Sequence, residues 1–465
     1  MNLGFYKLEN AQRWKYLIFP ALLVVGLILR LILSSYWTYE GDFGTWKAWA
    51  YGIYNTGFSK FYDQVWCDYM PGYLYVLWLL EYIHSAFPAM SDKILFKLPA
   101  NLSDLGISIL VFLVLRNITS LKNAQLTSLV YFFNPASLSN STFWGQVDSV
   151  HTLPLLVSIL FGVGGRFVLS SIFAAIAFMI KPQSVVIFPI IVFFAVRGVI
   201  RQRKEDRSVL KTLIFGFKIL AAFYATIIAI TLPFIWVELT NHSVIRIFSE
   251  PIFFIKERFY TAYNQYILTS LNAFNFWGIF AMWQNDQIRF LGVTYQRWGT
   301  ITFGFFYVMV CGVLFYSEVR RGQAGAQNFE YLLERNAFGS TANNQLTIRT
   351  FQALTLILFA LFLFVTRAHE RHFLPTIVFF TLIAFQSSLY WFFYALISAV
   401  YVVNMFYAYI ELMPRISEGT KTFIIKASSI QPFILGLVIL LLIIFFIIFV
   451  DFIRNSVGFY RQRSS

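Results

Sequence analysis

Charged residues and cysteines are scarce in this sequence. Asp, Glu, Lys and Arg together make up 12% of the 465 residues, against roughly 25% in a typical soluble domain. That shortage excludes an ordinary water-soluble globular protein. Of the two cysteines, Cys67 falls in a polar segment and Cys311 in the middle of an apolar run. We expect them at different depths in the molecule and predict no disulfide.

Nucleotide-binding signatures are also missing. The sequence contains neither a P-loop nor a Rossmann glycine pattern, and its longest predicted loops, at roughly 60 residues, are shorter than a typical separate domain. No internal repeat of fixed period and no low-complexity tract is present. These absences argue against a nucleotide-linked substrate and against the repeated halves of many transporters.

Hydrophobic and aromatic residues are abundant instead, at 58% and 20%, and the mean hydropathy is +0.66. Because a membrane-spanning helix needs about 20 apolar residues, the chain has room for about 12 such helices and little else. We therefore predict an all-α polytopic membrane protein. The net charge of +14 comes from Lys and Arg in short loops on one side, so we expect no nucleic-acid partner.

The densest basic cluster, at residues 197–207, fixes the predicted topology. Lys and Arg favour the cytoplasmic side of a membrane, and this cluster is cytoplasmic only if the apolar stretch 71–80 does not cross. That stretch is short and soon meets Glu81 and His84. We predict that it forms a helix lying at the membrane interface, within the first outer loop.

The first apolar run, 16–33, follows basic residues and precedes no small-residue cleavage site, which predicts an uncleaved first span. We expect both termini in the cytoplasm. Residues 1–411 form the predicted main membrane module, which would carry any catalytic site, with outer loops at 34–93 and 237–298. Residues 412–465 add a last transmembrane helix and a cytoplasmic tail.

A polar stretch directly after the first span contains two carboxylates, Glu40 and Asp42, with Trp46 and Trp49 close behind. A carboxylate can act as a general base towards a hydroxyl group, and flat aromatic rings can pack against a sugar ring. The alternative is an ordinary solvated loop with tryptophans at the level of the lipid headgroups.

Further polar motifs map to the same predicted outer face. They are Asp68 and Tyr69; Trp144, Gln146 and Asp148; Lys181 and Gln183; Asn272, Asn275 and Trp277; and Arg367, His369, Glu370, Arg371 and His372. Ionisable groups are costly at a membrane and are functional candidates by default. Taken together, these motifs predict a site that holds a lipid-linked phosphate beside a hydroxyl acceptor.

Each motif also has a structural interpretation. Asp148 could cap a helix, Lys181 could extend to the membrane surface with no further role, and Asn272 and Asn275 could form a turn. The two histidines beside Glu370 lack zinc-protease spacing and are flanked by arginines that would repel a cation. We predict no metal site there, with a bound divalent cation as the weaker alternative. Two arginines with two histidines suit an anion such as a phosphate group.

At these residues the chain resembles the GT-C superfamily of polyprenyl-phosphate-sugar-dependent glycosyltransferases. It is most similar to the prokaryotic mannosyltransferases related to the second mannosyltransferase of GPI-anchor synthesis. The segments that carry the resemblance are 40–42, 68–74, 134–135 with 144–149, 181–183, 272–277 and 369–372. The resemblance implies a GT-C-like fold with an interfacial helix after the first outer carboxylates.

The resemblance also implies an activity: inverting transfer of a sugar, with mannose expected, from a polyprenyl-phosphate donor to a lipid-linked or glycan acceptor on the extracytoplasmic face. Asp42 would be the catalytic base, with Glu40 as the second candidate, and no cofactor is expected. We assign the donor phosphate to Lys181, Gln183, Arg367, His369, Glu370, Arg371 and His372. We assign the sugar or the acceptor to Asp68, Tyr69, Trp144, Gln146, Asp148, Asn272, Asn275 and Trp277.

Two other classes of function fit the same residues. One is a polytopic transporter or flippase of lipid-linked sugars, and the other is a polymerase or ligase of surface polysaccharide. In each case we expect a plasma-membrane protein with an extracytoplasmic site, or a lumenal site in the endoplasmic reticulum of a eukaryote. We expect a monomer or simple homo-oligomer whose partners are the lipid-linked donor, the acceptor and membrane lipids.

Overall fold

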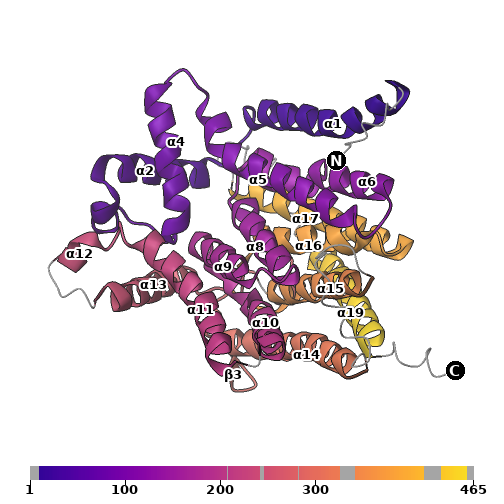
Figure 1. Cartoon of the computed structure of the whole chain (residues 1–465). Helices are drawn as coiled ribbons and strands as arrows, with labels where there is room; N and C mark the ends of the chain where they lie inside the picture. Colours follow the sequence, from indigo (N-terminus) through magenta and orange to yellow (C-terminus); the bar gives the residue numbers. More distant parts are fainter. Residues whose placement is uncertain are drawn as a thin grey trace.

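A computed structural model describes residues 10–206, 208–240, 246–280, 282–324, 341–412 and 431–457, and this part of the chain is largely helical (Figure 1). The described strands are only two residues long. β1 (Ser270–Leu271) runs parallel to β4 (Ala368–His369), and β2 (Arg289–Phe290) runs antiparallel to β3 (Val293–Thr294). The predicted all-α class is confirmed. The last residues of the predicted cytoplasmic tail, 458–465, and residues 1–9 lie outside the described residues.

Eight of the described helices are long and apolar enough to cross a membrane, which confirms a multi-pass membrane protein. They are α1 (Asn10–Ser34), α5 (Asp92–Leu115), α10 (Phe188–Asp206), α11 (Val209–Thr231), α14 (Tyr295–Ala324), α15 (Thr341–Phe364), α17 (Ser388–Leu412) and α19 (Gln431–Val457). The apolar window of α15 is 89% buried and that of α11 only 11%. Helix α15 therefore lies inside the bundle, whereas α11 presents its apolar side chains outward, as a lipid-facing helix must.

The other four predicted spans fall on shorter helices: α6 (Leu121–Phe132), α8 (Asp148–Val163), α9 (Phe167–Ile180) and α16 (Leu374–Ala384). At 1.5 Å per residue, even a 16-residue helix reaches only about 24 Å, less than the roughly 30 Å of a hydrocarbon core. Helix α16 is buried along its whole length, so protein rather than lipid surrounds it.

The predicted third span, 124–138, is not a continuous helix. Helix α6 ends at Phe132, and the chain restarts at Pro135 as α7 (Pro135–Ser137), which leads into the π-helix η2 (Leu138–Trp144). Proline has no N–H to donate, and it disfavours the helical conformation in the residue before it. Asn134 uses that break to cap α7, since its side chain accepts a hydrogen bond from the Ala136 N–H.

The segment predicted as the first outer loop contains α2 (Glu40–Thr56), η1 (Phe58–Lys60), α3 (Phe61–Gln64) and α4 (Pro71–Ala86). Helix α4 begins where the interfacial helix was predicted, and Figure 1 shows it running across the direction of α5. It starts against the end of α9: a Cβ added to Gly72 would lie 2.5 Å from the Met179 carbonyl oxygen. Only glycine allows that close approach, which places the start of α4 next to Lys181.

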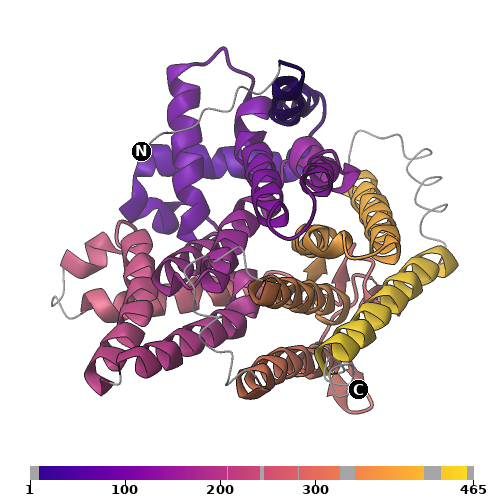
Figure 2. The ribbon, with the colours of Figure 1, turned by 45° about the vertical axis from the view of Figure 1, so that its right-hand side comes forward.

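The second half of the chain builds the centre of the bundle. The other described elements are η3 (Pro182–Ile187) in the first half of the chain and α12 (Trp236–Thr240), α13 (Arg246–Asn264), η4 (Phe276–Ile279) and η6 (Glu370–Phe373) in the second. The largest hydrophobic cluster runs along α15 and α16 and includes the fully buried Phe351, Phe359 and Ile377. In Figure 2 these two orange-brown helices lie between the magenta helices of the first half and the yellow α19.

A buried ion pair joins α1 to α5, and hydrogen bonds extend it to the segment between α6 and η2. Nη1 of Arg30 lies 2.8 Å from Oδ2 of Asp104 on α5. Nη2 of Arg30 donates hydrogen bonds to the Phe132 carbonyl (2.6 Å) and the Ser137 hydroxyl (2.7 Å). The Tyr131 hydroxyl donates to the other oxygen of Asp104 at 2.7 Å. This network holds the break between α6 and η2 against α1 and α5.

Candidate functional site

The carboxylate of Asp42 is held on one side and open on the other. Its Oδ2 atom accepts hydrogen bonds from Nε1 of Trp144 (2.9 Å) and Nε2 of Gln146 (2.5 Å). Nη1 of Arg371 lies 3.6 Å from the same oxygen. The Oδ1 atom accepts no hydrogen bond from any residue that the structure describes, and the side chain is 28% exposed. Asp42 therefore has a fixed orientation and one free oxygen.

The end of η2 and the turn after it present Trp144 and Gln146 to Asp42. Gly145 has φ +84, the left-handed region that glycine adopts at little cost, and a Cβ there would lie 2.6 Å from Cγ of Lys97. The Lys97 ammonium donates hydrogen bonds to the carbonyls of Ser34 (3.0 Å) and Phe143 (2.9 Å). Lys97 thus connects the end of α1 to the turn that positions the Trp144 indole and the Gln146 amide.

A second acid–base pair lies buried behind the first. Nζ of Lys181 is 2.6 Å from Oδ1 of Asp148, and their side chains are 7% and 1% exposed. The amide of Asn140 donates to Asp148 Oδ2 at 3.4 Å and to the Tyr401 hydroxyl at 2.9 Å. Burial lowers the pKa of Lys181, and the Asp148 carboxylate counteracts that effect. Val147 is the N-cap of α8 and no side chain caps this helix, so the capping role considered for Asp148 is wrong: Asp148 is the first residue of the helix and pairs with Lys181 instead.

The turn η6, directly before α16, contributes Arg371 and Glu370. Oε1 of Glu370 lies 3.7 Å from Nη1 of Arg371, so the guanidinium lies between two carboxylates. Burial raises the pKa of Glu370 to about 7, opposed by Arg371. Burial alone would lower the pKa of Arg371, but Asp42 and Glu370 outweigh burial and raise it. Arg371 is a permanent cation at this site.

The hydrogen-bonding capacity of Arg371 is unused. Its Nε atom is buried without a partner, and its side chain donates no hydrogen bond to the described residues. Oε1 of Glu370, Oε1 of Gln146 and Nδ1 of His151 are also buried without hydrogen-bond partners in this part of the chain. Buried polar groups are normally paired, so these unpaired atoms beside the Asp42–Arg371 and Asp148–Lys181 pairs are candidate contacts for a ligand.

His369 and His372 are neutral near pH 7. Burial, together with the nearby Lys181, lowers the pKa of His372 to about 3, and burial with Arg371 holds the pKa of His369 well below its usual value. Nδ1 of His372 accepts the His369 backbone N–H at 3.3 Å. Within the described residues, no group of three or more His, Cys, Asp or Glu side chains is arranged to hold a metal ion.

Asp68 and Tyr69 approach the same cluster from the loop before α4. Burial raises the pKa of Asp68, opposed by Arg371 and reinforced by Asp42. Burial also raises the pKa of Tyr69, and its ring packs against Trp49 with the ring centroids 5.0 Å apart.

Several predicted site residues are exposed or have structural partners instead. Glu40 and Gln183 are exposed. Nε of Arg367 pairs with Oδ2 of Asp286 at 2.7 Å, and its Nη1 atom donates to the Tyr263 carbonyl at 2.7 Å. These contacts direct the Arg367 guanidinium to the segment 237–298 rather than to Asp42.

The predicted site residues of that segment, Asn272, Asn275 and Trp277, hydrogen-bond to the protein itself. Asn272 has φ +61 and accepts a hydrogen bond from Nε1 of Trp283 at 2.9 Å. The Asn275 side chain accepts the Gly278 N–H, and Nε1 of Trp277 donates to the Phe364 carbonyl at 2.6 Å. These side chains shape the loop that carries β1.

The tryptophans expected to form flat walls are buried. Trp46, Trp49 and Trp277 are at most 5% exposed, and Trp144 is 1% exposed. Trp144 reaches the site through its ring nitrogen, while its ring packs against Tyr39 with the centroids 5.2 Å apart. The indole ring of Trp144 therefore acts as a hydrogen-bond donor rather than as a sugar platform.

Several members of the site went unnoticed in the sequence. Asn140 and His151 adjoin the Asp148 pair, and Tyr401 comes from α17, far along the chain. Charged residues inside apolar runs were an available signal for Arg30 and Lys97. Nothing near Tyr401 in the sequence separates it from the other aromatic residues of its helix.

No protein-family model matches the chain, and the search of curated proteins gives no match. The chemistry of the site must therefore carry the functional argument. That chemistry is an oriented carboxylate with one free oxygen, next to a guanidinium with unused donors, on a membrane protein.

Proposed function

We propose that the protein is an integral-membrane glycosyltransferase of the GT-C type. It transfers a sugar, with mannose expected, from a polyprenyl-phosphate donor to a lipid-linked or glycan acceptor on the extracytoplasmic face. The eight long helices, with the four shorter ones, would make up the twelve helices of this arrangement. The crosswise α4 would lie at the membrane surface beside the site.

The observation that supports the proposal most strongly is the asymmetry of the Asp42 carboxylate. Three groups engage Oδ2, namely Trp144, Gln146 and Arg371, whereas Oδ1 is free among the described residues. A general base must be oriented and must keep one oxygen accessible to the proton that it accepts. Asp42 meets both conditions, and the exposed Glu40 has no comparable support.

In the proposed reaction, the acceptor hydroxyl gives its proton to Oδ1 of Asp42 while its oxygen attacks the anomeric carbon of the donor sugar. A new carbon–oxygen bond forms as the bond from the anomeric carbon to the phosphate oxygen breaks. The electron pair leaves with the polyprenyl phosphate, and the anomeric configuration inverts. No co-reactant is needed.

Arg371 is the strongest candidate to receive the departing phosphate. Its guanidinium is cationic and has unused donors, and guanidinium groups bind phosphate through two parallel hydrogen bonds. Lys181 already pairs with Asp148, and His369 and His372 are neutral. We therefore assign these three residues to shaping the site and donating single hydrogen bonds.

One observation favours the alternative of a transporter or flippase of lipid-linked sugars. The pair Arg30–Asp104 lies within the long apolar helices α1 and α5, and ionisable groups inside membrane helices are typical of transport pathways. A surface-polysaccharide polymerase or ligase would use similar chemistry with a larger lipid donor.

The deciding experiment is sugar transfer in reconstituted liposomes. Wild type, Asp42→Asn and the matched control Glu40→Gln would be compared with a panel of polyprenyl-phosphate sugars and a glycolipid extract as acceptor. We expect transfer from one donor, a loss of about a hundredfold or more in Asp42→Asn and near-normal transfer in Glu40→Gln. Translocation of lipid-linked sugar without transfer from any donor would overturn the enzyme and support the transporter.

A further inference from the structure

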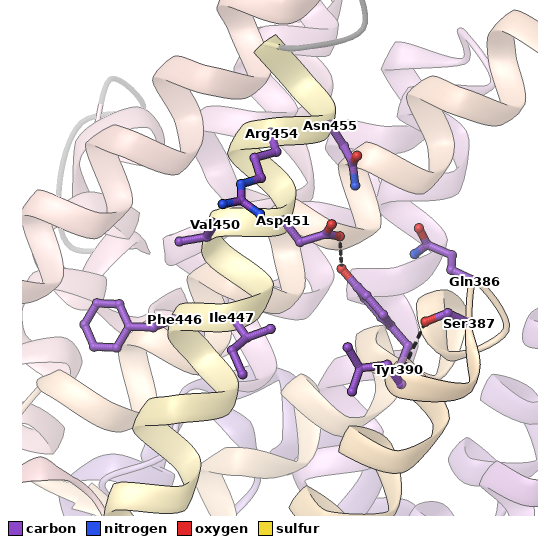
Figure 3. Close-up of a pocket in the computed structure, with 10 residues that line it drawn as sticks. Gln386, Ser387, Tyr390, Phe446, Ile447, Val450, Asp451, Arg454 and Asn455 are labelled. Carbon is purple, nitrogen blue, oxygen red and sulfur yellow. Dashed lines mark hydrogen bonds between the residues drawn. The ribbon is translucent and has the colours of Figure 1, made fainter.

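A pocket of about 610 Å³ lies between the C-terminal part of α19 and the turn from α16 to α17 (Figure 3). Its polar lining comprises Gln386, Ser387, Tyr390, Asp451, Arg454 and Asn455. Its apolar lining comprises Leu389, Phe446, Ile447 and Val450. A pocket that is polar on one side and apolar on the other fits an amphiphilic ligand.

The pocket is at the opposite end of the bundle from Asp42. Helix α17 begins at Ser388, beside the pocket, and reaches Tyr401, which contacts the candidate site, about 20 Å further along. At the pocket end, Nη2 of Arg349 donates to the Asn455 carbonyl at 2.8 Å, which joins the start of α15 to the end of α19. A ligand here would therefore occupy the membrane leaflet opposite the proposed transfer site.

The polar half offers one acidic and one basic group that do not neutralise each other. Oδ2 of Asp451 accepts a hydrogen bond from the Tyr390 hydroxyl at 2.6 Å, drawn as a dashed line in Figure 3. Arg454 follows three residues later on the same face of α19, and it is exposed. No ion pair joins Asp451 to Arg454, or either of them to another described residue. Both charges are therefore available to a ligand.

The apolar half faces away from the protein. Leu389, Phe446, Ile447 and Val450 are all exposed large hydrophobic residues, and α19 is one of the helices suited to cross the membrane. This surface continues along α19 from the charged end of the pocket. It is the place where acyl chains would lie if a headgroup occupied the polar half.

We propose that this pocket binds a phospholipid with a primary-amine headgroup. The ammonium group would donate hydrogen bonds to Asp451, the phosphodiester would bind Arg454, and the acyl chains would run over Phe446 and Ile447. A quaternary amine cannot donate such hydrogen bonds, and an anionic headgroup without an amine would leave Asp451 uncompensated next to a phosphate. This binding site is independent of the glycosyl transfer proposed above.

The test is native mass spectrometry of the full chain in detergent with an equimolar mixture of ethanolamine, choline and glycerol phospholipids. Three variants would be compared: Asp451→Asn, Arg454→Gln and the control Arg116→Gln. Arg116 is also exposed and follows α5 near the start of α15, where Asn344 donates to the Asn117 carbonyl at 3.1 Å. It lies outside the pocket.

We expect wild type to retain the ethanolamine lipid about fivefold or more over the other two lipids. Asp451→Asn should abolish this preference, since a charge-assisted hydrogen bond is lost, and Arg454→Gln should weaken retention of all phospholipids by about tenfold. The control should match wild type. Equal retention of ethanolamine and choline lipids by wild type, or a preference that survives both pocket variants, would overturn the proposal.

Two additions keep the test decisive if Asp451→Asn unfolds. Val450→Trp fills the apolar half without touching a charge and should reduce lipid retention while the melting temperature holds. Glycerophosphoethanolamine, which has the headgroup without acyl chains, should fail to compete with the lipid. Competition by this soluble headgroup at similar concentration would show that the pocket takes a water-soluble amine phosphate and would refute the lipid assignment.

Discussion

Two arginine–carboxylate pairs in this molecule differ in how completely they are satisfied. Arg30 and Asp104 are 2.8 Å apart with side chains 2% and 0% exposed, whereas Arg371 and Asp42 are 3.6 Å apart with side chains 17% and 28% exposed. Arg30 uses its Nε, Nη1 and Nη2 atoms in hydrogen bonds. Arg371 donates none from its side chain to the described residues.

The Arg30–Asp104 pair therefore has a structural role, whereas the Arg371–Asp42 pair retains hydrogen-bonding capacity for a ligand. A fully bonded buried ion pair is rigid, and breaking it leaves an uncompensated charge. A guanidinium with unused donors has already lost part of its hydration without replacing it, so an anion that enters gains contacts and displaces little. An arginine paired with an aspartate can thus stabilise the fold or bind a ligand, and the surrounding hydrogen-bond partners distinguish the two cases.

The largest expected effect tests the satisfied pair. Arg30→Met leaves Asp104 buried without its cation, and we expect a loss of about 3–5 kcal/mol in the free energy of unfolding. Adding Asp104→Asn should recover part of that loss, because the orphaned charge is removed. Thermal unfolding in detergent micelles, with Arg371→Gln as the matched arginine variant, is the measurement. A smaller loss of unfolding free energy in Arg30→Met than in Arg371→Gln would contradict the structural role assigned to the Arg30–Asp104 pair.

The next effect concerns pH and Glu370, whose pKa burial raises to about 7 from an ordinary value of 4.5. A raised pKa means that the folded protein keeps a proton that the unfolded chain releases, so this contribution to stability is complete below about pH 4.5 and is lost as the pH rises through about 7. Relative to Glu370→Gln, wild type should lose on the order of 2 kcal/mol between pH 5 and pH 8.

Melting temperatures of the two proteins across that pH range check this prediction. Glu40→Gln serves as the control, because Glu40 is exposed and its removal should leave the pH dependence of wild type unchanged. Parallel curves for wild type and Glu370→Gln would show that Glu370 is ionised in the folded protein throughout.

A moderate effect is expected from the unsatisfied pair. Arg371→Gln should raise the KM for the lipid-linked donor by about tenfold, because a charge-assisted contact to phosphate is lost, while the melting temperature changes little. Arg371→Lys keeps the charge but not the planar fork and should fall between the two. Donor titrations in liposomes provide the values. An unchanged KM in Arg371→Gln would show that another cation binds the donor phosphate.

The smallest expected effect compares two glutamines. Gln146 donates to Oδ2 of Asp42, whereas Gln183 is exposed and donates to no described residue. Gln146→Ala should therefore reduce transfer about fivefold or more through misorientation of the base, and Gln183→Ala should stay within about twofold. Initial rates at saturating donor distinguish them, and equal losses in the two variants would contradict the assigned geometry.

Much of the architecture follows from local sequence features. The long apolar runs predict membrane helices because the bilayer sets their length, and eight such helices are confirmed. The stretch 71–80 becomes α4, which the structure extends to Ala86. The break at Asn134 and Pro135 was readable from proline chemistry, although the predicted span ran through it.

The sequence by itself determined that this is a multi-pass membrane protein with polar motifs between its helices, because hydropathy and residue type are local properties. Only the tertiary structure decided which polar residues meet. Glu40 and Asp42 are two residues apart and so lie on different sides of α2, which leaves only Asp42 beside Trp144 and Arg371. Arg367 forms an ion pair with Asp286, which lies about 80 residues earlier in the chain. Such pairings depend on contacts across the whole chain, and no local pattern encodes them.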